Sequence, residues 1–151
     1  MTSRRMILLI MVPILAAALT AGCASTPTLT ASPGHAGMAM APLDSLPSDV
    51  QTAPVPVRES YQFAAANPEV LQELPCYCGC GAMGHGSNYD CYVAGVDSTG
   101  ALKYDPHALG CSICVDITQD TMRLLREGKT VPEIRAYVDA NYARYGPSNM
   151  P

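Results

Sequence analysis

Three cysteines alternate with a tyrosine and a glycine in residues 75–81, Pro-Cys-Tyr-Cys-Gly-Cys-Gly, of a chain of 151 residues. In an extended backbone, side chains two and four residues apart lie on one face, so the three sulfurs can point the same way. Gly79 and Gly81 can adopt positive φ angles, which lets the segment curl until the sulfurs converge. Three soft donors at one point are typical of a site for a thiophilic metal, with a disulfide knot as the alternative.

The first 22 residues have the pattern of an export signal, with two arginines, an apolar stretch over 6–19 and small residues before Cys23. The apolar stretch is shorter than a typical membrane span. Residues 19–23, Leu-Thr-Ala-Gly-Cys, resemble a bacterial lipobox, in which the cysteine is lipidated and becomes the mature N-terminus. An ordinary cleaved secretory signal is the alternative. In both cases we expect an extracytoplasmic protein, and lipidation of Cys23 would anchor it to a bacterial membrane, in the periplasm or at the cell surface.

Removal of the predicted signal takes away two arginines and no acidic residue, so the formal net charge changes from -4 to -6. An acidic domain without a basic cluster argues against nucleic acid and anionic membrane surfaces as partners. The sequence has no paired carboxylates, Ser/His/Asp set, phosphate loop or nucleotide fingerprint. We therefore expect no catalytic residues and a binding protein rather than an enzyme.

Residues 23–57 are rich in Ala, Pro, Ser and Thr and show no helical or strand periodicity, which predicts a disordered tether behind the lipid anchor. His35, Met38 and Met40 lie within this segment. Imidazole and thioether donors suit Cu(I), so these residues are candidates for an auxiliary metal site, with a low-complexity linker as the alternative.

The predicted domain covers residues 58–146, followed by a tail over 147–151. We expect a mainly α, small Cys-rich domain of about three to four helices, with a thiol loop and minor β segments. Thr130 and Glu133 form a capping box at the start of the last helix, which Gly146-Pro147 ends. The predicted helices are 58–66, 68–74, 112–126 and 131–145, and the β-prone pieces are 91–93 and 101–104.

The domain contains six cysteines and two histidines, which are candidate metal ligands. They are Cys76, Cys78, Cys80, Cys91, Cys111, Cys114, His85 and His107. An even number of cysteines in an exported domain suggests disulfides, but a bridge within Cys-x-Cys is strained and disulfides have no use for imidazole. Six thiols and two imidazoles exceed one tetrahedral site, so two sites or a polynuclear thiolate cluster fit better.

Cys111-Ser-Ile-Cys114 lies where the helix over 112–126 should begin, so both sulfurs can share one helical face. The positive end of the helix dipole stabilises thiolate there. This pattern is ambiguous between a metal clasp and a redox centre. Met83, beside the thiol loop, is a candidate thioether ligand, with simple packing as the alternative.

Several segments resemble the bacterial lipoproteins named for their PCYCGC motif, a largely uncharacterised family. The resemblance covers most of residues 58–146 and implies an exported, metal-handling domain. The matching segments are Pro75–Cys80, Gly84–Tyr92, His107 with Cys111 and Cys114–Asp116, and Ile134-Arg135 with Asp139 and Tyr142.

The leading hypothesis is a membrane-anchored protein that binds Cu(I) through a Cys/His thiolate site and delivers or sequesters it. Soft, sulfur-rich donors favour Cu(I), and zinc is the alternative. Its partners would be the metal ion, the membrane and a protein that donates or accepts the metal. Two other hypotheses remain open: a thiol–disulfide oxidoreductase that uses Cys111 and Cys114, and a structural interaction domain stapled by zinc or disulfides.

Overall fold

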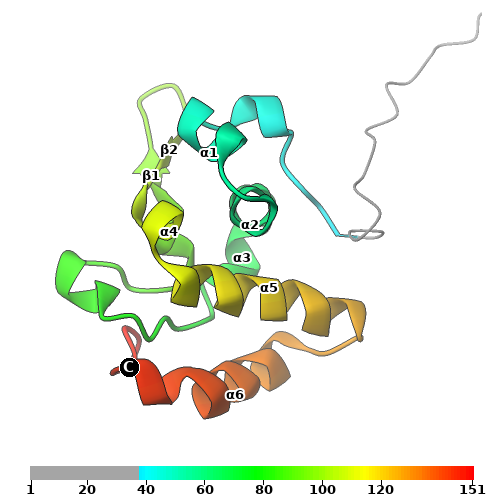
Figure 1. Cartoon of the computed structure of the whole chain (residues 1–151), viewed down its shortest axis with the longest axis vertical. Helices are drawn as coiled ribbons and strands as arrows, with labels where there is room; N and C mark the ends of the chain where they lie inside the picture. Colours follow the sequence, from blue (N-terminus) through cyan, green and yellow to red (C-terminus); the bar gives the residue numbers. More distant parts are fainter. Residues whose placement is uncertain (1–37) are drawn as a thin grey trace, which may run out of the picture. The chain divides into compact units, whose positions relative to one another are not determined.

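Helix α5 (Ser112–Arg126) runs through the middle of the domain and packs against α2 (Val55–Ala66) on one side and α6 (Val131–Tyr142) on the other (Figure 1). The computed structural model describes residues 38–151. Both ends of α5 lie where the sequence predicts them. Its buried positions, among them Ile117, Thr121 and Leu124, recur at helical spacing and face the neighbouring helices.

The remaining elements are short, and the predicted class of a mainly helical domain with minor β structure is confirmed. Strands β1 (Val93–Val96) and β2 (Leu102–Tyr104) pair as an antiparallel hairpin, with Val96 opposite Leu102. The other elements are α1 (Ser48–Thr52), α3 (Pro68–Leu71), α4 (His107–Gly110), and the 3₁₀ turns η1 (Leu43–Ser45), η2 (Cys80–Met83), η3 (Tyr89–Cys91) and η4 (Ala143–Tyr145).

The core contains two fully buried tyrosines, Tyr61 of α2 and Tyr92 between η3 and β1. Their rings meet edge to face with centroids 5.0 Å apart, a favoured aromatic geometry. The Tyr61 hydroxyl donates to the carbonyl of Asp105 at 2.6 Å, so it ties α2 to the segment that enters α4. Phe63, Leu71, Ile117, Met122 and Ile134 fill the space between the helices and are also fully buried.

The capping box at the last helix is present as predicted. The Thr130 amide donates to the Glu133 carboxylate at 2.8 Å, and the hydroxyl of Thr130 also contacts this carboxylate. Helix α6 ends at Tyr142, three residues before the predicted end, and continues as the 3₁₀ turn η4. Gly128, with a φ of +78°, forms the left-handed turn between α5 and α6.

The predicted tether boundary at residue 57 is wrong for the part of this segment that the structure describes. Residues 43–45 and 48–52 are helical, and Leu46 and Val50 are buried. Pro42, Pro47 and Pro54 each stand directly before a helix, where a missing amide hydrogen costs nothing. The prolines that suggested disorder therefore start three successive helical segments.

The five C-terminal residues are also more than a tail, because Asn149 hydrogen-bonds to the thiol loop. Gly146 makes this return path possible. A Cβ atom at Gly146 would lie 2.9 Å from the carbonyl oxygen of Tyr77, closer than real Cβ contacts. The described part of the chain contains no helix that is long and apolar enough to cross a membrane.

Candidate metal centre

All eight cysteines and histidines predicted as ligands lie close together, in four overlapping groups. Within each group, one nitrogen or sulfur atom per residue lies within 4.8 Å of the others. The loop over 76–91 supplies four cysteines and His85, and the region from α4 to the start of α5 supplies the rest. Segments separated by about twenty residues therefore meet at one centre.

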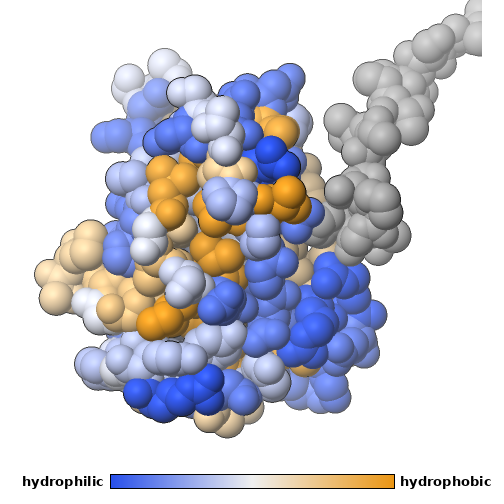
Figure 2. Space-filling model, viewed as in Figure 1, coloured by the Kyte–Doolittle hydropathy of each residue, from blue (hydrophilic) through white to orange (hydrophobic). Residues whose placement is uncertain are grey.

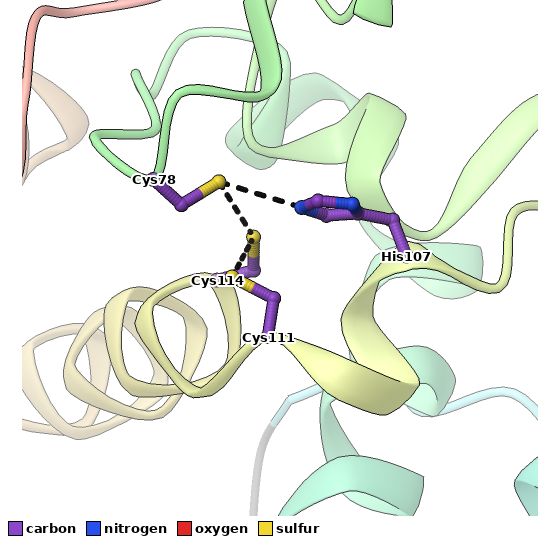
Figure 3. Close-up of side chains that lie close together, drawn as sticks. All are labelled: Cys78, His107, Cys111 and Cys114. Carbon is purple, nitrogen blue, oxygen red and sulfur yellow. Dashed lines mark hydrogen bonds between the residues drawn. The ribbon is translucent and has the colours of Figure 1, made fainter.

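The first four-donor group consists of Cys78, His107, Cys111 and Cys114 (Figure 3). The Cys78 sulfur lies 3.4 Å from Nε2 of His107 and 3.6 Å from the Cys114 sulfur, and the sulfurs of Cys111 and Cys114 are 3.4 Å apart. His107 starts α4, whereas Cys111 precedes α5 with an extended backbone (φ −119°, ψ 99°). The chain bends between the two helices, and this bend lets both residues face Cys78.

The second four-donor group consists of Cys80, His85 and Cys91, together with His107 again. The Cys80 and Cys91 sulfurs are buried and 3.6 Å apart. The rings of His85 and His107 meet edge to face at 5.2 Å between centroids. The two histidines therefore stand side by side, where the two groups adjoin.

Cys76 lies between these groups and belongs to both three-sulfur groups, Cys76 with Cys78 and Cys80, and Cys76 with Cys91 and Cys114. Its fully buried sulfur is 3.3 Å from that of Cys114 and 3.4 Å from that of Cys78. Thiols of Cys114 and Cys91 donate hydrogen bonds that hold the pKa of Cys76 far below its ordinary value, although burial opposes this.

The pKa values of two neighbouring thiols, Cys114 and Cys78, are raised instead of lowered. Hydrogen bonding to Cys76 raises the pKa of Cys114, and burial, followed by the charge of Cys76, raises that of Cys78. Without a cation, the buried sulfurs cannot all carry negative charge, because buried like charges repel and lose hydration. A bound metal ion would remove this restriction.

None of the six described cysteines forms a disulfide. Their closest sulfur–sulfur distances are 3.3–3.6 Å, whereas a disulfide bond is about 2.05 Å long. Two thiolates bound tetrahedrally to one ion at about 2.3 Å would be roughly 3.8 Å apart. The observed spacing is therefore near that of a metal–thiolate site.

Nδ1 of His85 has no hydrogen-bond partner and is buried, while the whole side chain is only 10 % exposed. An unsatisfied buried nitrogen costs about 1–3 kcal/mol. Its other nitrogen, Nε2, lies 3.6 Å from Oδ2 of Asp105. A metal-binding histidine commonly presents one nitrogen to the ion and the other to a carboxylate, so this arrangement fits a ligand.

Asp105 connects both histidines. Its Oδ1 atom accepts a hydrogen bond of 2.8 Å from the His107 amide, while Oδ2 faces His85. One carboxylate therefore fixes the start of α4 and the orientation of the His85 ring. Nothing in the sequence indicated the contact between Asp105 and His85.

A buried polar network holds the first turn of α5. The Tyr92 hydroxyl donates to the Cys114 carbonyl at 2.8 Å, and the Thr118 hydroxyl donates to Oδ1 of Asn88 at 2.9 Å. Tyr92, Asn88 and Thr118 are all fully buried. Because each of these polar groups has a partner, the network can fix the backbone beneath Cys114 without a desolvation penalty.

The thiol loop is anchored on its other sides by Tyr77 and Asp90. The Tyr77 hydroxyl donates to Asp139 of α6 at 2.6 Å, and the Asp90 carboxylate accepts from the amides of Gly86 and Ser87. Left-handed turns occur at Gly79 (φ +85°) and Gly84 (φ +92°). Of the two glycines that can adopt a positive φ in the thiol loop, Gly79 does so, whereas Gly81 does not and packs against Asn149.

Asn149 is the residue of this region that sequence reasoning missed. Its side-chain oxygen accepts a hydrogen bond from the backbone amide of Cys76 at 2.7 Å, and its backbone amide donates to the Cys76 carbonyl at 3.1 Å. Nδ2 of Asn149 donates to the carbonyls of His85 and Ser87. A lone asparagine near a chain end carries no local signal of such a contact.

The predicted auxiliary ligands are Met83, Met38, Met40 and His35, of which the structure describes the three methionines. Met83 is 61 % exposed in η2, and Met38 and Met40 are partly buried against the hydrophobic core. The backbone between these two methionines accepts a hydrogen bond from Asn67, so packing accounts for their position. His35 and the predicted lipidation site Cys23 lie outside the described residues.

A small helical domain with a buried Cys/His cluster defines a candidate metal-binding protein. The chain belongs to the family described as proteins of unknown function with PCYCGC motif, whose model matches residues 11–151. No curated protein and no solved structure matches the chain. The resemblance inferred from residues 75–80 is therefore confirmed, and the function must be argued from the site.

Proposed function

We propose that the protein is a membrane-anchored, extracytoplasmic protein that captures Cu(I) in its Cys/His cluster and passes it on or sequesters it. The observation that carries this proposal is the convergence of six thiols and two imidazoles on one centre. In the described residues, the groups of metal-ligating side chains contain only sulfur and nitrogen donors. Soft donors of this kind select thiophilic ions over Mg²⁺ and Ca²⁺.

Two features favour copper over zinc. The overlapping three-sulfur groups around Cys76 suit Cu(I), which readily accepts three thiolates and shares thiolates between ions, whereas structural zinc takes four ligands in a closed site. Cys78, His107 and Cys111 are also only partly buried, so an incoming ligand can reach this side. A structural zinc site would not require such access.

Capture and release need only ligand exchange. A donor or acceptor protein would offer a thiolate to the copper ion while the bond from copper to Cys111 breaks. Copper remains Cu(I), no electron is transferred, and the proton lost by the incoming thiol passes to solvent or to Cys111. Positioning of the donors is the whole contribution of the protein, so no catalytic residue is assigned.

The location rests on residues 1–23. The export-signal pattern and the lipobox-like segment before Cys23 support transfer across a bacterial membrane and anchoring by lipid. Residues 24–37 would then separate the metal centre from the bilayer. Mass spectrometry of the mature N-terminus tests this part: a diacylated or triacylated Cys23 is expected, and an unmodified N-terminus elsewhere would contradict it.

Metal analysis after anaerobic, reducing purification tests copper binding. We expect copper at one equivalent or more and thiols that resist alkylation, with the affinity for at least one copper ion largely lost in Cys78→Ser and Cys111→Ser but kept in the control Met83→Leu. Tightly held zinc would favour a structural domain. Absence of metal, with one fast-reacting thiol in the Cys111–Cys114 pair, would favour an oxidoreductase, since these sulfurs lie 3.4 Å apart at a helix start.

A further inference from the structure

We infer that the cluster holds two metal ions in unequal sites, one that is retained and one that is exchanged; this inference rests on the proposed function. The eight donors divide into two sets of three sulfurs and one imidazole. The outer set is the group Cys78, His107, Cys111 and Cys114. We assign to the inner set Cys80, His85 and Cys91, which form a second group with His107, together with Cys76, which shares three-sulfur groups with Cys80 and with Cys91.

The outer set is complete without any inner residue, because its four donor atoms lie within 4.8 Å of one another. Among the inner residues, Cys80, His85 and Cys91 satisfy the same limit, and Cys76 meets it with Cys80 and with Cys91. One ion with four ligands would leave four buried or half-buried donors without a role. Two ions use all of them.

The unpartnered nitrogen of His85 supports the inner site independently. Nδ1 of His85 is buried without a hydrogen-bond partner, in the group that contains Cys80 and Cys91. Asp105 faces the opposite nitrogen, which leaves Nδ1 available for an ion. An ion bound only by the outer set would not satisfy this atom.

The two sites differ in access to solvent. Cys76, Cys80 and Cys91 are at most 1 % exposed, and the His85 side chain is 10 % exposed. Three of the four outer residues are half-buried. Cys111 also lines a groove of about 260 Å³ between α2, α4 and α5, with Val57 and Leu109, and Figure 2 shows apolar groups among hydrophilic ones around α2 and α4. An incoming ligand therefore reaches the outer ion first.

Cys76 links the two sites, because its sulfur lies 3.3 Å from Cys114 and 3.4 Å from Cys78. From this position the Cys76 sulfur can contribute to the outer ion while it binds the inner one. When the outer ion leaves, the thiolates of the acceptor would replace its bonds to the outer set, beginning with the bond to Cys111. Cys76 and the inner ion would stay in place. The inner ion thus keeps the loop folded while the outer site exchanges.

Anaerobic loading of the full-length chain in detergent, followed by extraction with a chromophoric Cu(I) chelator, tests the division. We expect two copper ions, released in two phases that differ roughly tenfold or more in rate, a barrier difference of about 1.4 kcal/mol. Cys111→Ser should remove the fast phase alone, and His85→Gln and Cys91→Ser should remove the slow phase. Met83→Leu should retain both. Circular dichroism checks that each variant is folded. If Cys91→Ser does not fold, the result for His85→Gln alone tests the slow phase.

The outcomes separate this inference from the proposed function. No bound copper in the parent chain would overturn both. Copper that leaves in one phase, or loss of the same phase in Cys111→Ser and His85→Gln, would overturn the division into two sites while leaving copper binding intact. A single stoichiometric ion would also contradict the division.

Discussion

Asn149 and Cys76 lie 73 positions apart and exchange two hydrogen bonds, one from the Cys76 amide to Oδ1 of Asn149 and one from the Asn149 amide to the Cys76 carbonyl. The pair closes the C-terminal segment onto the first cysteine of the thiol loop. Because Cys76 occupies the centre of the sulfur cluster, this contact joins the chain end to the metal centre.

Asn149→Ala should therefore weaken both folding and metal binding. The buried Cys76 amide would lose its partner at a cost of about 1–3 kcal/mol, and Cu(I) affinity should fall roughly 10- to 100-fold, as for other residues that hold ligands in place. Chemical denaturation and competition with a Cu(I) chelator measure the two effects. Gln72→Ala, at an exposed amide directly after α3, is the control. Unchanged copper affinity in Asn149→Ala would show that the tail does not position the cluster.

Gly146→Ala should displace the same tail through a clash with the backbone of the thiol loop. The added Cβ would stand 2.9 Å from the backbone oxygen of Tyr77, so one of the two segments must move. We expect a loss of stability and faster proteolysis of residues 147–151. Gly110→Ala, where a Cβ meets nothing within 4 Å, provides the control and should be tolerated. Equal stability of the two variants would contradict the packing described for Gly146.

Asp105→Asn should lower metal affinity with little effect on the fold. The amide oxygen can still accept from the His107 backbone, but the negative charge beside Nε2 of His85 is lost. We expect Cu(I) affinity to fall about 10- to 100-fold while the melting temperature of the metal-free chain changes little. The control Asp44→Asn, at an exposed acidic residue of η1, should change neither the Cu(I) affinity nor the melting temperature. A wild-type copper affinity in Asp105→Asn would show that the Asp105 carboxylate does not support metal binding by His85.

Tyr92→Phe should destabilise the domain by about 1–3 kcal/mol, because the carbonyl of Cys114 loses a buried hydrogen-bond donor. Denaturant unfolding of the metal-free chain measures this difference. Tyr145→Phe removes a hydroxyl from a side chain that is 50 % exposed and should change stability by much less. If both variants had the same free energy of unfolding, the network beneath Cys114 would not be a specific source of stability.

The long helices and the ligands were predictable because their signals are local. Helix α5 carries an apolar stripe along its whole length, and the capping box marks the start of α6 within four residues. The eight candidate ligands were identified by chemical type alone, since few residues other than Cys and His bind soft ions. Their arrangement around Cys76 could not be predicted from the sequence, because it depends on how distant segments pack together.

The errors share one physical origin, since each involves contacts between distant segments. Residues 43–52 look disordered by composition, yet Leu46 and Val50 are buried in the domain core. Asn149, Asp105 and Gly146 act on atoms far away in the sequence, so neither propensity nor periodicity marks them. In a domain with one phenylalanine and no tryptophan, such specific polar contacts take a larger part in fixing the structure.

X-ray absorption spectroscopy of the copper-loaded full-length chain reports the oxidation state and the ligands of the bound ion together, so it is the sharpest check on Cu(I) binding by the Cys/His cluster. We expect Cu(I) with mainly sulfur neighbours at about 2.3 Å, the usual length of a bond from a soft ion to thiolate, and a nitrogen contribution that decreases in His107→Ala. Copper surrounded mainly by oxygen, or a spectrum unchanged when Cys78 and Cys111 are both replaced by serine, would contradict it.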